Sequence, residues 1–168
     1  MQKKTLFTTK KVVLTALMAA LTVAGSYFRI VLPIDIAGTT AFHLGNIMCA
    51  LSGILLGPWL GGLAAGLGSA IFDMLNPLYI SEAWITFLFK GAYGLVAGLV
   101  ICCGKKQWGY GRAILSACAG AVVYAALYLL KSYFYNGLLL HGLTPDAAWL
   151  TIMSTLPATT FNEAVAII

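Results

Sequence analysis

Charge is the scarcest property of this sequence. Of its 168 residues only 9% are charged and just five are acidic, while 61% are hydrophobic. Soluble domains carry roughly 25% charged residues, so the composition excludes an ordinary water-soluble domain and predicts an integral membrane protein. A nucleic-acid-binding surface is also excluded in spite of the net charge of +5, because there is no soluble domain to carry it.

Motifs that carry chemistry are equally lacking. The sequence contains no Walker motif, no HExxH, no GxSxG and no paired carboxylates. Its four cysteines and two histidines lack the spacing of zinc or haem motifs, and we expect the cysteines to be buried, inert thiols. We therefore expect no enzyme activity, no cofactor and no metal, with an intramembrane enzyme as the less favoured alternative.

Long apolar segments are what the chain has in abundance. A membrane-spanning helix needs about 20 residues, somewhat fewer where neighbouring helices shield it. Six segments meet this length criterion, at about 12–32, 40–56, 58–75, 82–103, 113–139 and 147–168. The predicted fold is therefore all-α, a single domain of six transmembrane helices in the cell membrane.

The basic residues predict the orientation of this bundle. They gather before the first segment and between the fourth and fifth, without acidic neighbours: Lys3, Lys4, Lys10 and Lys11, then Lys105, Lys106 and Arg112. Lys and Arg in short loops stay on the cytoplasmic side. Both termini are thus predicted to be cytoplasmic, and His141 and Asp146 to lie outside.

A glycine-rich stretch from His43 to Leu75 holds a single charge, Asp73. Small residues recur at every fourth position in two registers: Gly57, Gly61, Ala65 and Ser69, then Gly62, Gly66 and Ala70. Residues four apart share a helix face, and small ones let membrane helices approach closely. The stretch predicts a tightly packed helical hairpin whose outer ends, around Asn46 and Asp73, touch a binding pocket.

The fifth segment carries the best candidate for a binding face. Tyr124, Tyr128, Lys131 and Tyr135 are spaced four, three and four residues apart, so they share one helix face. This face either packs inside the bundle or forms a wall for a flat ring, with Lys131 meeting a polar or anionic group. Trp84 and Tyr93 suit an aromatic ligand in the same way.

Two charges lie inside apolar segments, where charges are costly and usually functional. Lys90 is in the middle of the fourth segment, and Glu163 is in the sixth beside Asn162. They form a structural pair or contact the ligand. The predicted substrate-binding residues are therefore Tyr128, Lys131, Tyr135, Tyr124, Lys90, Glu163, Asn162, Trp84, Asn46 and Asp73.

The first segment repeats alanine at every fourth position, at Ala16, Ala20 and Ala24. Such a face serves either packing within the bundle or docking of another membrane protein.

The chain resembles the substrate-binding S components of energy-coupling factor (ECF) transporters. The resemblance rests on Ala16-x-x-x-Ala20 after a basic N-terminus, on the block LGNIMCALSGILLGPWLGGLAAGLGSAIFDML at 44–75, and on Leu156-Pro157 with Asn162. The central block is similar to that of the riboflavin-type group. The resemblance covers nearly the whole chain.

This resemblance implies a function and partners. S components capture a vitamin outside the cell, dock on a transmembrane coupling subunit through the alanine face, and rely on two cytosolic ATPase subunits. The ligand stays open among riboflavin, a pyridoxine-like compound and a pyrimidine-like compound. The alternative from another class is a membrane scaffold or assembly subunit without a ligand.

Overall fold

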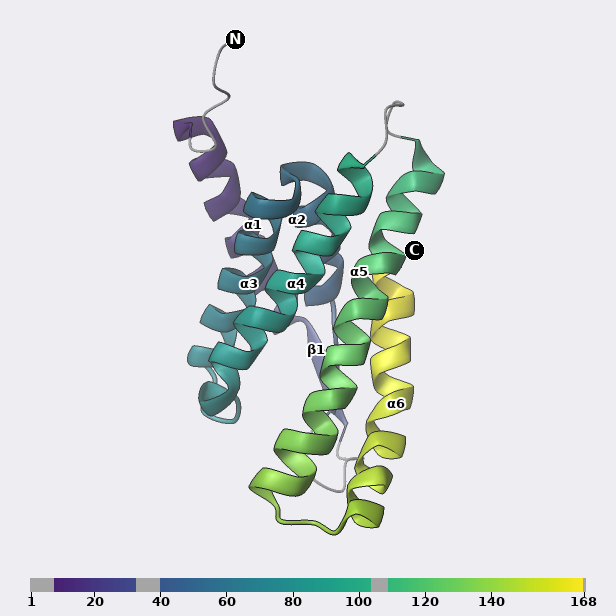
Figure 1. Cartoon of the computed structure of the whole chain (residues 1–168). Helices are drawn as coiled ribbons and strands as arrows, with labels where there is room; N and C mark the ends of the chain where they lie inside the picture. The colour runs from purple at the N-terminus through teal and green to yellow at the C-terminus, as the bar shows by residue number, and fades with distance from the viewer. Residues whose placement is uncertain (1–7, 33–39, 104–108, 168) are drawn as a thin grey trace.

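The computed structural model describes residues 8–32, 40–103 and 109–167 (Figure 1). Its elements, in chain order, are α1 (Thr9–Tyr27), β1 (Arg29–Leu32), β2 (Thr40–His43), α2 (Gly45–Leu56), α3 (Pro58–Met74), η1 (Ile80–Glu82), α4 (Ala83–Cys102), α5 (Tyr110–Lys131), η2 (Ser132–Leu140) and α6 (Pro145–Ile167). η1 is a 3₁₀ turn, and η2 is a π-helix that continues α5. Within the described residues there are thus six α-helices, the number that the sequence predicts.

A two-stranded β-hairpin is found at two places where the sequence predicts helix. Residues 29–32 and 40–43 were expected in the first and second helices, but β1 and β2 pair antiparallel, with Arg29 opposite His43. Short apolar runs such as RIVL and TAFH fit a strand as well as a helix, and hydropathy alone does not distinguish them. The long apolar segments at both sites therefore contain a helix and a strand each.

Three of the described helices are long and apolar enough to cross a membrane, judged by length and composition. They are Thr9–Tyr27, Ile80–Cys102 and the continuous helix Tyr110–Leu139, while α2 is a shorter apolar helix. The predicted six membrane crossings remain an expectation. The predicted orientation rests partly on Lys3, Lys4, Lys105 and Lys106, which lie outside the described residues.

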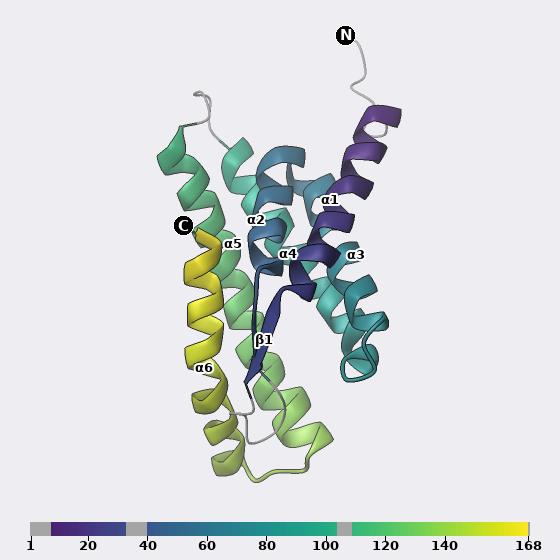
Figure 2. The same ribbon diagram turned by 180° about the vertical axis from the view of Figure 1, so that it is seen from behind.

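The helices form two groups with the hairpin between them (Figures 1 and 2). α3 packs against α1, α2 and α4, and α5 joins this group to α6 through its contact with α4. α5 and α6 run antiparallel and extend beyond the other helices at the end where η2 lies. β2 contacts α6, so the hairpin reaches across the interior from one group to the other.

Glycines bring α2, α3 and α4 into backbone contact, as the sequence predicts for the small-residue registers. A Cβ at Gly61 would lie only 2.5 Å from the Cα of Gly53, and one at Gly94 would lie 2.7 Å from the carbonyl oxygen of Gly61. Gly57, at φ 79°, turns the chain between α2 and α3, and Pro58 begins the next helix. This close packing leaves no room for side chains at the helix crossings.

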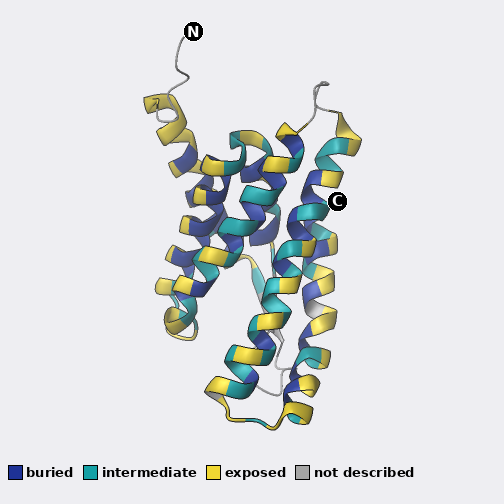
Figure 3. Ribbon diagram, in the orientation of Figure 1, coloured by how far each residue is buried: buried dark blue, intermediate teal, exposed yellow. Residues whose placement is uncertain are grey.

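Exposure follows the pattern of a protein in lipid rather than in water (Figure 3). Large apolar side chains such as Leu17, Trp59 and Val122 are exposed, whereas Lys90 and Glu163 are buried. The described helices expose many large apolar side chains, which is unusual for a soluble monomer. The expectation of buried cysteines holds for Cys49 but is wrong for Cys102 and Cys103, which are exposed at the end of α4.

Candidate functional site

Lys90, Asn46 and Glu163 form a hydrogen-bonded chain in the interior, one residue each from α4, α2 and α6. The Lys90 ammonium donates to Asn46 Oδ1, and Asn46 Nδ2 donates to Glu163 Oε1. The three residues are only 4%, 1% and 6% exposed. The structure thus links Lys90 and Glu163 through the Asn46 amide rather than in a direct ion pair.

The start of α2 explains how Asn46 reaches this position. Gly45 precedes it, and a Cβ there would lie 2.5 Å from the Ser26 hydroxyl oxygen, so a larger residue would require the Ser26 side chain to move. Asn46 then points its amide toward α4 and α6 from the first turn of α2. The Asn46 amide thus gives each of the two buried charges, the Lys90 ammonium and the Glu163 carboxylate, a hydrogen-bond partner in the apolar interior.

Three tyrosines extend from this chain along α4 and α5. The rings of Tyr93 and Tyr124 stack with centroids 5.8 Å apart, and those of Tyr124 and Tyr128 lie 5.9 Å apart. Lys90 Nζ lies 4.1 Å from the centroid of Tyr124, a cation–π distance. The structure therefore places Tyr124 and Tyr128 on one face, with part of their ring surface already covered by protein neighbours.

Tyr93 is the most deeply buried of the three tyrosines, although it is not among the predicted substrate-binding residues. It is fully buried, at 0% exposed, and follows Lys90 by three residues on α4. That spacing puts both residues on one helix face, a signal that was available in the sequence.

Lys131 forms an ion pair with Glu82 of η1. The two side chains are 8% and 18% exposed, and Lys131 Nζ also lies 5.6 Å from the centroid of Tyr128. The prediction that Lys131 meets an anionic group of a ligand is untested; in this structure its anionic neighbour is a carboxylate of the protein. The pair ties η1 to the end of α5.

Asn162 holds the hairpin against α6. Its Oδ1 accepts a hydrogen bond from the backbone N–H of His43 at 3.0 Å. His43 pairs with Arg29 across the hairpin, so this hydrogen bond fixes the end of β2 on α6.

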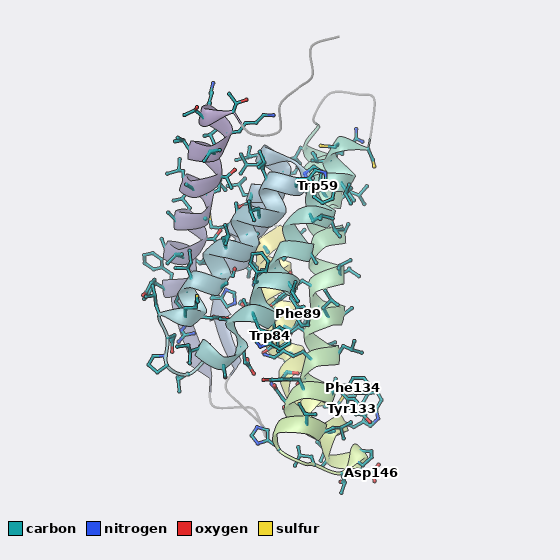
Figure 4. All side chains as sticks on the ribbon, turned by 60° about the vertical axis from the view of Figure 1, so that its left-hand side comes forward. Trp59, Trp84, Phe89, Tyr133, Phe134 and Asp146 are labelled. Carbon is teal, nitrogen blue, oxygen red and sulfur yellow. The ribbon has the colours of Figure 1, made fainter. Side chains whose placement is uncertain are left out.

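Other predicted residues lie outside the hydrogen-bonded chain. Trp84 is 61% exposed at the start of α4, and Asp73 is half-buried near the end of α3. Tyr135 lies in η2, one turn beyond Lys131. In Figure 4, Tyr133 and Phe134 lie near the Asp146 end of the molecule and Trp59 lies toward the opposite end.

Several polar atoms in the interior have no hydrogen-bond partner. Within the described residues they are His43 Nδ1, Ser132 Oγ and Asn136 Oδ1, whereas the Tyr93 hydroxyl and the Glu163 carboxylate are hydrogen-bond partners of each other. Buried polar groups are nearly always paired, since leaving one unpaired costs about 1–3 kcal/mol. The unused hydrogen-bonding capacity of the described interior therefore lies in β2 and η2.

An apolar groove of about 550 Å³ lies elsewhere, between the ends of α5 and α6. It is lined by Ala126, Leu129, Leu130, Tyr133, Trp149, Ile152, Met153 and Leu156. Its largely apolar, partly exposed lining does not match a polar heterocycle. Among the described residues no group of three His, Cys, Asp or Glu side chains is placed to hold a metal ion.

Ala16, Ala20 and Ala24 are all exposed on α1. The buried face of this helix is formed by other residues: Thr15, Met18, Ala19, Thr22, Gly25 and Ser26. The alanines therefore do not pack within the chain, and their predicted role in docking is untested.

Comparison with known proteins gives one family and two relatives. The family model described as the S component of the ECF-type riboflavin transporter matches residues 6–168. An uncharacterized protein in gap 3'region of Pyrococcus woesei is 34% identical over 118 residues, which cover 70% of this chain and 74% of that protein. A UPF0397 protein of Streptococcus gordonii is 35% identical over 96 residues, which cover 57% of this chain and 49% of that protein.

Proposed function

Because this chain belongs to the family of S components of ECF-type riboflavin transporters, we propose that it captures a small ring-containing vitamin or precursor outside the cell for ATP-driven uptake. The family is one of membrane transport proteins rather than enzymes. The chain is thus an S component of a vitamin transporter. Which vitamin it binds, and with which subunits it works, belong to the proposal.

The observation that carries this proposal is the buried chain Lys90–Asn46–Glu163 beside stacked tyrosines. Burying two opposite charges costs several kcal/mol per ion, and a helix bundle that is held together by packing alone needs no buried charges. Polar groups in the interior of a membrane bundle most often mark a ligand pathway or binding site. An aromatic wall next to a donor and an acceptor suits a flat heterocycle with polar edges.

The ligand is proposed from the same three classes that the sequence leaves open: riboflavin, a pyridoxine-like compound or a pyrimidine-like compound. Each is a flat ring with hydrogen-bonding substituents. The description of the matching family favours riboflavin as the first ligand to test.

The proposed partners are a transmembrane coupling subunit and two cytosolic ATPase subunits. The sequence has no Walker motif, so ATP hydrolysis through a P-loop has to come from other chains. The exposed alanine face on α1 supports docking, since small side chains let helices of two proteins approach closely. The proposed location is the cell membrane, as a multi-pass protein.

Titration calorimetry on the protein in lipid nanodiscs tests the proposed binding function. Riboflavin, pyridoxine and uracil are titrated separately, and saturable binding of one ligand per chain is expected for one of them. Lys90→Met should weaken that binding at least about 10-fold, because it leaves Asn46 Oδ1 unpaired. Asp146→Asn, an exposed change at the start of α6, is the control. Binding of none of the three would favour the scaffold alternative.

A further inference from the structure

The apolar groove between α5 and α6 is built in the same way on both sides. Each helix contributes four side chains to it: Ala126, Leu129, Leu130 and Tyr133 from α5, and Trp149, Ile152, Met153 and Leu156 from α6. Both sets follow the spacing i, i+3, i+4, i+7, so each set comes from a single helix face. At a rise of 1.5 Å per residue, the groove follows the helix pair for about 10 Å.

The groove differs in polarity between its two ends. Because α5 and α6 run antiparallel (Figures 1 and 2), Tyr133 and Trp149 lie at the same end, with ring centroids 6.0 Å apart. They carry a hydroxyl and an indole N–H, and the other lining side chains have no N–H or O–H group. Ala126 and Leu156 lie at the opposite end. The groove is thus polar at one end and apolar along the rest of its length.

The polar end of the groove is also the end of the helix pair. Phe134 packs edge-on against Tyr133, with ring centroids 4.9 Å apart, and Figure 4 shows both near the Asp146 end of the molecule. Tyr and Trp side chains are enriched where a membrane protein meets the lipid headgroups. The aromatic end of the groove therefore fits the headgroup level, and its apolar end fits the hydrocarbon region.

The groove is open to the surroundings of the protein. Leu130 and Met153 are exposed at its rim, whereas Leu129 and Ile152 are half-buried at its floor. The exposed apolar surface continues along α5 at Val122, and α5 with η2 is long and apolar enough to cross a membrane. Since the chain belongs to a family of membrane transport proteins, this surface adjoins the hydrocarbon of the bilayer.

We propose that the groove binds one acyl chain of a membrane lipid. The glycerol and headgroup end of the lipid lies at Tyr133 and Trp149, which donate hydrogen bonds to its ester or phosphate oxygens, and the chain points toward Ala126 and Leu156. The volume of about 550 Å³ is that of a small-molecule site, and the narrow, uncharged lining suits a single flexible hydrocarbon chain. This lipid differs from the lipid around the bundle because two helices hold it at once.

The bound chain should stabilise the pairing of α5 with α6. The buried face of α6 consists of small side chains in this region, at Ala148, Thr151 and Thr155. Apolar area drives no association between helices that lie in lipid, so close packing decides how firmly they pair. A hydrocarbon chain in the groove supplies dispersion contacts to both helices that an empty groove lacks.

Native mass spectrometry of the full chain tests the inference. The protein is delipidated in dodecyl maltoside and titrated with palmitoyl-oleoyl phosphatidylethanolamine. Ala126→Trp and Leu156→Trp fill the apolar end of the groove from different helices, so a folding failure of one leaves the other informative. Trp149→Phe keeps an aromatic ring and removes the indole N–H. Leu115→Trp, on an exposed part of α5 outside the groove, is the matched control.

The wild type and Leu115→Trp should bind one lipid per chain saturably, and the added lipid should raise their melting temperatures. Ala126→Trp and Leu156→Trp should weaken this binding at least about 10-fold, because the new ring occupies the space of the chain. Trp149→Phe should weaken it about 2- to 10-fold, the effect of one hydrogen bond.

Four results would overturn the inference. Lipid binding to the wild type that never saturates would assign the lipid to the general surroundings of the bundle. Equal binding by Ala126→Trp and Leu115→Trp would place the lipid elsewhere. A wild-type dimer that Ala126→Trp dissociates would assign the groove to a second copy of the chain. Unchanged binding by Trp149→Phe would contradict the orientation of the lipid. Each of these results leaves the proposed vitamin-binding function standing.

Discussion

Lys131, in the last turn of α5, is ion-paired with Glu82 of η1, although 49 positions separate them in sequence. The pair connects the segment that follows α3 to the end of α5 where η2 begins. Neither side chain is more than 18% exposed, so each charge depends on the other for its solvation.

Removing one member of this pair should destabilise the protein. Glu82→Gln and Lys131→Met should each lower the free energy of unfolding by about 3–5 kcal/mol, the usual cost of leaving a buried charge unpaired. The exchanged double variant Glu82→Lys/Lys131→Glu should recover part of the loss. Thermal unfolding in detergent measures this, with Asp146→Asn as control. Unchanged melting of both single variants would show that water solvates the pair.

Replacing glycine by alanine should have different effects at a helix contact and at an exposed helix end. Gly61→Ala places a Cβ 2.5 Å from the Cα of Gly53, so α2 and α3 must move apart. We expect a loss of about 1–3 kcal/mol or failure to fold. Gly111→Ala meets nothing within 4 Å at the exposed start of α5 and should be neutral or slightly stabilising. Equal yields and melting temperatures of the two variants would contradict the packing.

Arg29 should control the mobility of the hairpin. Its guanidinium carbon lies 5.0 Å from the centroid of Phe72 and 4.8 Å from that of Tyr79, between two aromatic rings. Arg29→Ala removes both cation–π contacts, worth about 0.5–2 kcal/mol each. Amide hydrogen exchange of β1 and β2 should accelerate, while Lys10→Gln on α1 leaves it unchanged. If hairpin exchange is the same in all three proteins, Arg29 does not hold the hairpin.

The alanine face of α1 should determine assembly with the coupling subunit. Ala16→Trp and Ala20→Trp place a bulky ring on an exposed face and should abolish co-purification with that subunit, while binding of the vitamin is retained. Val122→Trp is the control, because Val122 is 69% exposed on α5. A complex that survives both alanine variants would place the docking surface elsewhere.

The sequence predicts the helices better than it predicts the site. Apolar length and four-residue spacing identify the helices and the close packing of Gly61, because both depend on neighbours along the chain. These two features do not identify the hairpin, because β1 and β2 are short apolar runs beside helices. A period of 3.6 residues carries no information about a pairing between Arg29 and His43.

The individual roles at the site could not be predicted for a related reason. Lys90 and Glu163 stand out as charges in apolar segments, but nothing local indicates that Asn46 lies between them. Glu82 likewise has no sequence feature that marks it as the partner of Lys131. Such contacts depend on how α2, η1, α4, α5 and α6 assemble, and tertiary packing decides that.

The most direct test of the account is uptake of labelled riboflavin by proteoliposomes that contain this chain with a coupling subunit and two ATPase subunits. Uptake should require both this chain and ATP hydrolysis by the ATPase subunits on the cytoplasmic face. Lys90→Met should abolish uptake while the assembled complex remains intact. Uptake at the same rate without this chain, or with Lys90→Met, would contradict the account.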